Sequence, residues 1–201
     1  RDSSTSRGLG DVYKRQNKIY VDGQLKGSGS TQDVSKYSKS SIYVFCTHRG
    51  GEAKYNASMR LYELQMYNGD TLIRDFIPIL DQNNVAYLYD KVEKKFYYNS
   101  GTGTFNYKKK DSQNMQLTKV NYIESTGTQY IDTGVKPSNS TKVDIKFMYN
   151  SLNGFVYGSR TSSSGSDAHE FIINASGLVF PQFDGQHSEA VSYTHLRAHE
   201  T

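Results

Sequence analysis

The chain has 201 residues, which is enough for one globular domain or two small ones. Its 24 basic and 20 acidic residues give a net charge of +4, without the dense basic stripe of a nucleic-acid-binding surface. No apolar run reaches the roughly 18 residues of a membrane span, and the single cysteine, Cys46, excludes an intrachain disulfide and a cysteine-based zinc site. The composition, with 17 Tyr, 9 Phe and 17 Gly but only 3 Pro, is typical of short strands joined by turns.

The two ends of the chain differ in character from everything between them. Residues 1–16 end in DVYKRQ and residues 190–201 contain VSYTHLRAHET, and both strings resemble translated sequencing-adapter read-through. We therefore interpret 1–16 and 190–201 as adapter-like artefacts without ordered structure and exclude them from functional reasoning. The remaining residues 17–189 are expected to be an internal fragment of a longer protein.

Turn residues between short apolar runs predict two hairpins of the same kind. Asp22–Gly23 follows the run that ends at Val21, and Asn68–Gly69 separates residues 59–67 from residues 71–77. Both dipeptides tolerate positive φ, which a two-residue hairpin turn requires. Pro78 is expected to end the second arm, because proline cannot donate to the hydrogen-bond ladder.

Further along the first half, residues 41–46 form a β-branched and aromatic run that predicts a buried strand. A third hairpin is expected between residues 85–89 and residues 95–98. The stretch 108–119 is polar and unpatterned, and we interpret it as a linker.

The second half contains the clearest alternation in the chain. Val143, Ile145 and Phe147 alternate with polar residues, as in a strand with one buried face. Shorter apolar runs separated by Gly, Ser and Asn follow it. The series of short strands along the whole chain predicts an all-β fold, an antiparallel β-sandwich.

Two stretches of sequence carry a family resemblance. Residues 122–134, YIESTGTQYIDTG, resemble the opening of a laminin-G-like, concanavalin-A-like jelly-roll domain of bacterial and phage surface proteins. Residues 60–78, 88–90 and 96–105 resemble the closing segment of that family. The closing half therefore precedes the opening half along this chain.

The resemblance implies that residues 17–107 are the C-terminal half of one repeat and residues 120–189 the N-terminal half of the next. First and last strands of such a domain lie close together, so the two halves are able to dock in either chain order. We therefore predict one circularly permuted sandwich, in which the apolar face of 143–147 meets apolar residues of 42–46 and 59–66.

The resemblance also implies a function. It indicates a non-catalytic module that binds a glycan or another surface polymer, in a secreted, cell-surface or virion protein with neighbouring repeats. A structural spacer repeat without a ligand is the first alternative, and a fragment of a jelly-roll glycoside hydrolase is the second. The paired carboxylates of those hydrolases, in a Glu-x-Asp-x-x-Glu pattern, are absent from the sequence, so we expect no enzymatic activity. No nucleic-acid partner and no membrane insertion are expected.

The predicted ligand-binding residues are His48, Arg49, Tyr157, Arg160, Phe183 and Asp184. His48 and Arg49 lie in the stretch THRGG, which predicts a loop, and loops carry many binding residues. The rings of Tyr157 and Phe183 are able to stack on the apolar face of a sugar, although a core or cross-strand position is the ordinary role of a strand aromatic.

No cofactor is predicted. Domains of the laminin-G-like family often hold calcium, which needs roughly six to eight oxygen ligands, several of them carboxylates. Asp81–Asn84 and Asp184–Gly185 offer oxygens, but the sequence contains no Asp-x-Asp-x-Asp array. We interpret both stretches as ordinary turns.

Overall fold

The computed structural model describes residues 10–15, 18–21, 24–28, 38–109, 118–151, 153–161, 167–173, 178–183, 186–187 and 191–192, and side chains within 38–109, 118–151, 153–161 and 167–172. These residues form two β-sheets, and none of them lies in a helix. The predicted all-β sandwich is therefore confirmed. The same residues contain no helix of the length and apolarity needed to cross a membrane.

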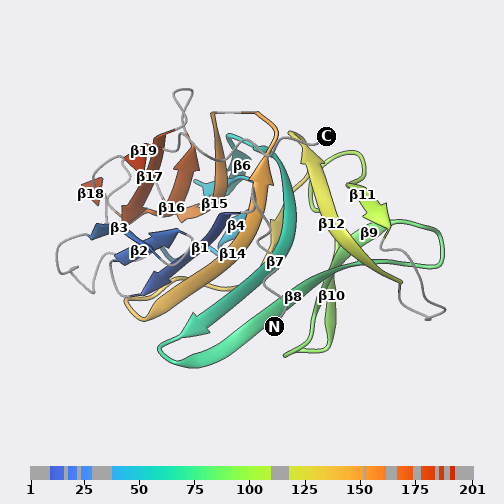
Figure 1. Cartoon of the computed structure of the whole chain (residues 1–201), viewed down its shortest axis with the longest axis horizontal. Helices are drawn as coiled ribbons and strands as arrows, with labels where there is room; N and C mark the ends of the chain where they lie inside the picture. Colours follow the sequence, from blue (N-terminus) through green and yellow to red (C-terminus); the bar gives the residue numbers. More distant parts are fainter. Residues whose placement is uncertain are drawn as a thin grey trace, which may run out of the picture.

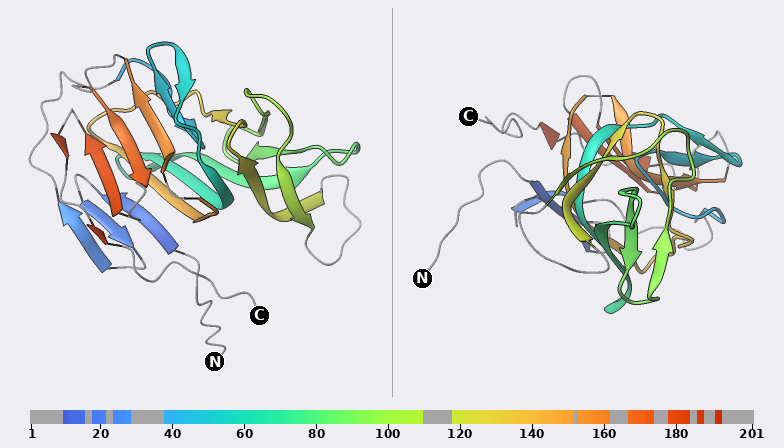
Figure 2. Two further views of the ribbon diagram at one scale, coloured as in Figure 1. Left: turned by 90° about the horizontal axis from the view of Figure 1, so that it is seen from above. Right: turned by 90° about the vertical axis from the view of Figure 1, so that its right-hand side faces the viewer.

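The first sheet has ten strands (Figure 1): β1 (Gly10–Arg15), β2 (Lys18–Val21), β3 (Gln24–Ser28), β7 (Ser58–Asn68), β8 (Thr71–Leu80), β9 (Ala86–Asp90), β10 (Lys95–Tyr97), β11 (Asn106–Lys109), β12 (Thr118–Thr126) and β14 (Thr141–Tyr149). Their order across the sheet is β10–β9–β8–β12–β7–β14–β1–β2–β3, and β11 pairs with β12 off this path. The strands β8–β10 and β12 lie at the opposite end of the molecule from β1–β3 (Figure 2).

The second sheet has nine strands: β4 (Tyr43–Val44), β5 (Thr47–Arg49), β6 (Glu52–Lys54), β13 (Ile131–Asp132), β15 (Gly154–Arg160), β16 (His169–Ile173), β17 (Leu178–Phe183), β18 (Gln186–His187) and β19 (Val191–Ser192). Its main path runs β13–β4–β15–β16–β17–β18. All pairings in both sheets are antiparallel except the one between β5 and β15.

The three predicted hairpins are present as β2–β3, β7–β8 and β9–β10. In β7–β8 the paired residues Asn68 and Thr71 enclose Gly69 and Asp70, so the turn lies one residue further on than predicted. Gly69 has φ of 61°, a value that glycine adopts without a Cβ clash.

The expectation that Pro78 ends the second arm is wrong, because β8 continues through it to Leu80. Along one edge of β8, Phe76 is the last residue registered against β7 and Ile79 is the first registered against β12. Pro78 lies between the two, where that edge changes neighbour. Its missing N–H therefore interrupts no ladder on that side.

The strand β12 joins the two halves of the chain within one sheet. The hairpin arms β7 and β8 separate beyond Leu64 and Phe76, and β12 lies between them, pairing with the start of β7 and the end of β8. On its other edge β7 pairs with β14 along nearly its whole length. The second sheet also contains strands from both halves of the chain, since β15 from the second half pairs with β4 and β5 from the first. Strands from residues 17–107 and 120–189 thus form both sheets together.

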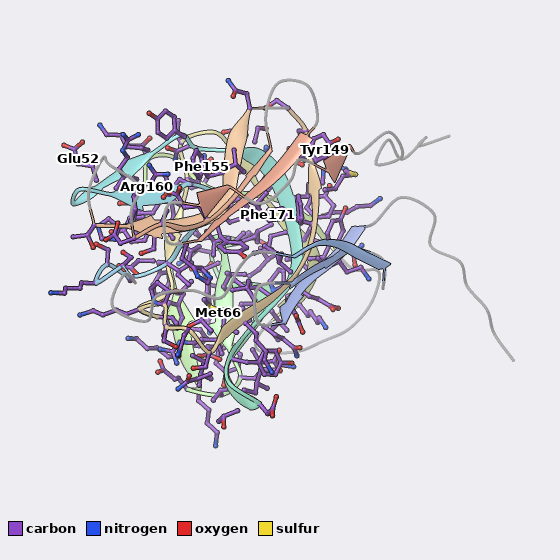
Figure 3. The ribbon with its side chains drawn as sticks, turned by 90° about the vertical axis from the view of Figure 1, so that its left-hand side faces the viewer. Glu52, Met66, Tyr149, Phe155, Arg160 and Phe171 are labelled. Atoms are coloured by element: carbon purple, nitrogen blue, oxygen red, sulfur yellow. The ribbon has the colours of Figure 1, made fainter. Side chains whose placement is uncertain are left out.

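The core lies between the sheets. Burial along β14 alternates as predicted, with Val143, Ile145 and Phe147 buried. These residues belong to the same hydrophobic cluster as Ile42, Val44, Phe45, Met59, Leu61, Leu64 and Met66 from the first half of the chain. Figure 3 labels Met66 of β7 and Phe171 of β16, which reach this cluster from opposite sheets.

Part of the N-terminal stretch is built into the first sheet. Residues 10–15 form β1, which pairs with β14 on one side and β2 on the other. The expectation of no ordered structure for residues 1–16 is therefore wrong for these six residues. A strand edge such as that of β14 presents unpaired N–H and C=O groups, which pair with a neighbouring segment whatever its side chains. The same expectation for residues 190–201 is wrong for Val191 and Ser192, which form β19 and pair with β17. Residues 1–9, 16, 190 and 193–201 lie outside the described part of the chain.

The predicted linker is shorter than 108–119. The strand β11 extends to Lys109, and β12 begins at Thr118. The stretch between them, 110–117, lies outside the described residues.

Candidate functional site

The strands β5 and β6 form a small hairpin that carries two of the predicted ligand-binding residues. Gly50 and Gly51 form its turn with φ of 60° and 90°, and Arg49 pairs with Glu52. Two consecutive positive φ values are typical of a type I′ turn, which the two glycines adopt without strain. The predicted loop at 47–51 is therefore wrong: this stretch is a strand and a hairpin turn.

The chain reverses direction between β4 and β5, at Phe45. This residue has φ of 72°, which is uncommon for a bulky side chain. Its N–H donates to Val156 O at 2.9 Å, and its carbonyl accepts from Ala57 N at 2.7 Å. The run 41–46 is buried around Phe45 as predicted, but its strand covers only β4 because of this reversal.

His48 of β5 belongs to a stack of three rings with Tyr43 of β4 and Tyr130, the residue before β13. The Tyr43 ring lies 4.2 Å from the His48 ring and 4.9 Å from the Tyr130 ring, with interplanar angles of 12° and 23°. The His48 Nδ1 atom lies 3.3 Å from the carbonyl oxygen of Ser41. Burial raises the pKa of Tyr43 to about 12, and the nearby Asp132 carboxylate adds to the shift. The phenol of Tyr43 is therefore neutral at physiological pH.

Arg49 belongs to a different cluster, because successive residues of a strand point to opposite faces. Its Nη1 donates to Tyr55 Oη at 2.9 Å, and its guanidinium lies 5.7 Å from the centroid of the Tyr55 ring. The Phe155 ring lies 5.3 Å from the Tyr55 ring at 25°. Tyr55 is 55% exposed. We call these three residues, Arg49, Tyr55 and Phe155, the hairpin site.

Arg160 lies beside the hairpin but in the interior. It is registered against Arg49 across β15 and β5. Its Nε donates to Glu170 Oε1 at 2.9 Å, its Nη2 donates to Glu170 Oε2, and the Thr47 hydroxyl donates to Oε1. The Glu170 side chain is fully buried and that of Arg160 is nearly so. This ion pair holds β5, β15 and β16 together beneath the hairpin.

A glycine makes room for that ion pair. Gly158 on β15 lies opposite Glu170, and a Cβ at this position would lie 2.7 Å from Thr47 Oγ1 and 2.9 Å from Glu170 Cγ. Real Cβ atoms essentially never approach other atoms so closely. The absence of a side chain at Gly158 therefore allows the Thr47 and Glu170 side chains to pack over β15.

The remaining predicted site residues lie elsewhere. Tyr157 is 3% exposed and stacks on Phe171 at 5.9 Å in the core, where burial raises the pKa of its phenol. Phe183 is the last residue of β17, and its side chain lies outside the described residues, as does the whole of Asp184. The structure thus places His48, Arg49 and Arg160 on the paired strands β5 and β15. The three side chains contact different neighbours.

The described residues show no metal site. No group of three or more His, Cys, Asp or Glu side chains within them is arranged to hold an ion. The carboxylate of Asp81 instead accepts the backbone N–H groups of Asn83 and Val85, each at 2.8 Å. This stretch is a turn, as predicted. Asp184–Gly185 lies outside the described residues.

Sequence reasoning missed Tyr55 and Phe155. Tyr55 follows β6 with φ of 57°, and no periodic pattern marks a lone exposed residue of this kind. Phe155 is visible in the sequence as the start of a strand. The register shift between Phe155 and Tyr157 then separates two residues that strict alternation would place on one face.

Comparison of the chain with protein-family models, with curated proteins and with solved structures returns no match. The all-β sandwich architecture therefore rests on the sheets described above. The laminin-G-like resemblance rests on the sequence strings that suggested it.

Proposed function

We propose that this chain is a non-catalytic glycan-binding module whose hairpin site stacks against a sugar ring. The observation that carries the proposal is Tyr55, which is 55% exposed and is fixed by a hydrogen bond from Arg49 and a ring contact with Phe155. A ring fixed in this way offers apolar surface to a sugar, and little further ordering is needed on binding. The Arg49 guanidinium beside it is a donor for sugar hydroxyls.

The architecture agrees with this function. A two-sheet all-β sandwich is the fold expected of a laminin-G-like, concanavalin-A-like jelly-roll domain, although fold alone does not determine function. We propose that the chain belongs to that group in permuted order, and that it belongs to a secreted, cell-surface or virion protein next to neighbouring repeats.

The surroundings of Glu170 argue against the hydrolase alternative. A retaining glycosidase needs two carboxyl groups about 5 Å apart that face the substrate. Glu170 is fully buried, and both of its oxygens are bound by Arg160. Its role is therefore structural.

The test is a glycan array probed with the full chain and two variants at one position. Tyr55→Ala removes the exposed ring, whereas Tyr55→Phe keeps the ring and loses only the hydroxyl. Tyr62→Ala, a half-buried tyrosine on β7, serves as the control for a general loss of an aromatic side chain. Far-UV circular dichroism establishes that each variant is folded.

We expect saturable binding to a subset of glycans, a loss of about tenfold or more for Tyr55→Ala, and retention by Tyr55→Phe and Tyr62→Ala. An aromatic anchor at the centre of a contact typically has an effect of this size. Absence of any saturable binding would favour the spacer alternative. Equal binding by Tyr55→Ala and the parent chain would place the ligand elsewhere.

A further inference from the structure

Exposed apolar side chains gather on one hairpin at the far end of the first sheet. Among the described residues, five large hydrophobic side chains are at least 36% exposed, and four of them lie within residues 85–98: Val85, Val92, Phe96 and Tyr98. Figures 1 and 2 show that β9 and β10 lie away from β1–β3, at the other end of the molecule. Exposed apolar groups gathered in one place are typical of an interaction surface.

The register of β9 and β10 explains why four aromatic rings lie on one face of the hairpin, of which Phe96 and Tyr98 are exposed and Tyr87 is only 3% exposed. Leu88 and Tyr97 are opposite each other and buried, so their neighbours along each strand point to the outer face. The resulting rings lie 4.9–5.4 Å apart in the pairs Tyr87–Tyr98, Tyr89–Phe96 and Tyr87–Phe96. We call Tyr87, Tyr89, Phe96 and Tyr98 the β9–β10 aromatic face.

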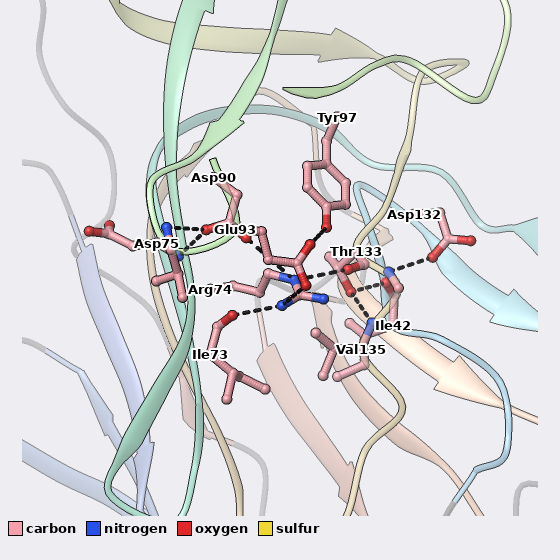
Figure 4. Close-up of polar contacts among 12 residues, drawn as sticks. Ile42, Ile73, Arg74, Asp75, Asp90, Glu93, Tyr97, Asp132, Thr133 and Val135 are labelled. Atoms are coloured by element: carbon pink, nitrogen blue, oxygen red, sulfur yellow. Dashed lines mark hydrogen bonds and ion pairs between the residues drawn. The ribbon is translucent and has the colours of Figure 1, made fainter. Parts of the chain in front are cut away.

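A polar network on the opposite face of the hairpin keeps it in place (Figure 4). Arg74 of β8 pairs with Glu93 at 2.7 Å and with the fully buried Asp90 at 3.6 Å. The Tyr97 hydroxyl donates to Glu93 at 2.7 Å. Asp90 also accepts the backbone N–H of Val92 in the hairpin turn. The aromatic face is therefore presented by a hairpin with a fixed conformation, as a preformed binding site requires.

Positive charge borders the aromatic face. Lys119 of β12 is registered against Ile79 of β8, and Ile79 is registered against Tyr87 of β9. Lys119 therefore lies on the same face as Tyr87, two strand spacings or about 10 Å away. Lys94 lies in the hairpin turn. Both lysines are exposed, and neither takes part in an ion pair among the described residues.

The acidic groups nearby have other partners. The Asp81 carboxylate is bound by two backbone N–H groups of its own turn. Asp75 pairs with Lys91 at 2.5 Å, and Glu93 pairs with Arg74. Within the part of the chain that the structure describes, the charges at this border without an ion-pair partner are therefore two lysines and the Asp81 carboxylate, which leave a net positive charge.

We propose that the β9–β10 aromatic face binds an anionic polysaccharide. Its sugar rings stack on Phe96 and Tyr98, and its acidic groups approach Lys119 and Lys94. Both rings suit this role because they are large, apolar and exposed. An apolar protein partner would not need the flanking lysines, so the charge favours the acidic polymer. The proposal is independent of the hairpin site and of the function proposed there.

The experiment measures binding of the full chain to polygalacturonate and to its methyl-esterified form, which has the same backbone without the charge. A poly(glycerol phosphate) arm, a polyanion without sugar rings, tests whether negative charge alone is enough for binding. The variants are Tyr98→Ala, Tyr98→Phe and Lys119→Gln. Lys136→Gln, at an exposed lysine of the segment between β13 and β14, is the matched charge control. Circular dichroism checks that each variant is folded.

We expect binding to polygalacturonate that is at least tenfold weaker for Tyr98→Ala and several-fold weaker for Lys119→Gln and for the esterified polymer. Tyr98→Phe and Lys136→Gln are expected to bind as the parent chain does, and added salt to weaken binding. Absence of binding to polygalacturonate, or binding to poly(glycerol phosphate) alone, would overturn the proposal. Equal binding by Tyr98→Ala, or equal losses for Lys119→Gln and Lys136→Gln, would also overturn it. Loss with Tyr55→Ala but not Tyr98→Ala would assign the polymer to the hairpin site instead.

Discussion

Phe147 offers a test of whether the two halves of the chain share one core. Its side chain is 3% exposed on β14, in the second half of the sequence. It is registered against Leu61 of β7, in the first half, and its ring meets Phe171 of the second sheet edge-on at 6.0 Å and 86°. Truncation to alanine therefore removes contacts to both halves and to both sheets.

The expected cost follows from this burial. Phe147→Ala is predicted to lower the free energy of unfolding by about 3–5 kcal/mol, and Leu61→Ala by about 2–5 kcal/mol. Either loss is a large part of the roughly 5–15 kcal/mol that stabilises a typical domain. Because the two residues are neighbours, the double variant is predicted to deviate from additivity by about 0.5 kcal/mol or more.

Urea unfolding followed by far-UV circular dichroism and by tyrosine fluorescence measures these quantities. A single sandwich predicts one transition with the same midpoint for both probes. Strict additivity of Phe147→Ala and Leu61→Ala would refute the shared core. Two separate transitions, of which each variant shifts only one, would refute it as well.

Three further predictions concern buried groups in the two sheets. Gly158→Ala is expected to destabilise the fold by about 1–3 kcal/mol in urea unfolding, because its Cβ would overlap Thr47 and Glu170; unchanged stability would contradict this. Cys46 is expected to react with iodoacetamide slowly in the native chain and rapidly in urea, because burial excludes the reagent and raises the pKa of the thiol; rapid native labelling would be the opposite result. Burial raises the pKa values of Tyr43 and Tyr97 to about 12, so the folded chain keeps protons that the unfolded chain releases near pH 10. The free energy of unfolding should therefore fall as the pH rises from about 10 to 12, and a constant value over that range would count against the buried positions of these phenols.

The parts of the fold that local chemistry determines were predictable. The hairpin β7–β8 follows from turn residues that accept positive φ, and β14 follows from strict alternation of apolar and polar residues. The mixing of both halves in one sandwich was predicted from the resemblance of residues 122–134 to a family opening.

Features that depend on tertiary packing were not predictable. The positive φ of Phe45 is stabilised by backbone hydrogen bonds to Val156 and Ala57, which lie more than 10 residues away along the chain. No local sequence pattern predicts it. The register shift beside Val156 places Tyr157 in the core and Phe155 next to Tyr55. Strict alternation would have placed both aromatic residues on one face. The sequence therefore identified Arg49 but not the ring that it holds.

The central claim is that the hairpin site binds a glycan. Chemical-shift mapping of the labelled full chain, titrated with the glycan that gives the highest array signal, tests it most directly. We expect saturable shifts of backbone amides in residues 47–55 and at Phe155, with the same dissociation constant at each. Shifts confined to residues 85–98, or no saturable shifts at all, would contradict it.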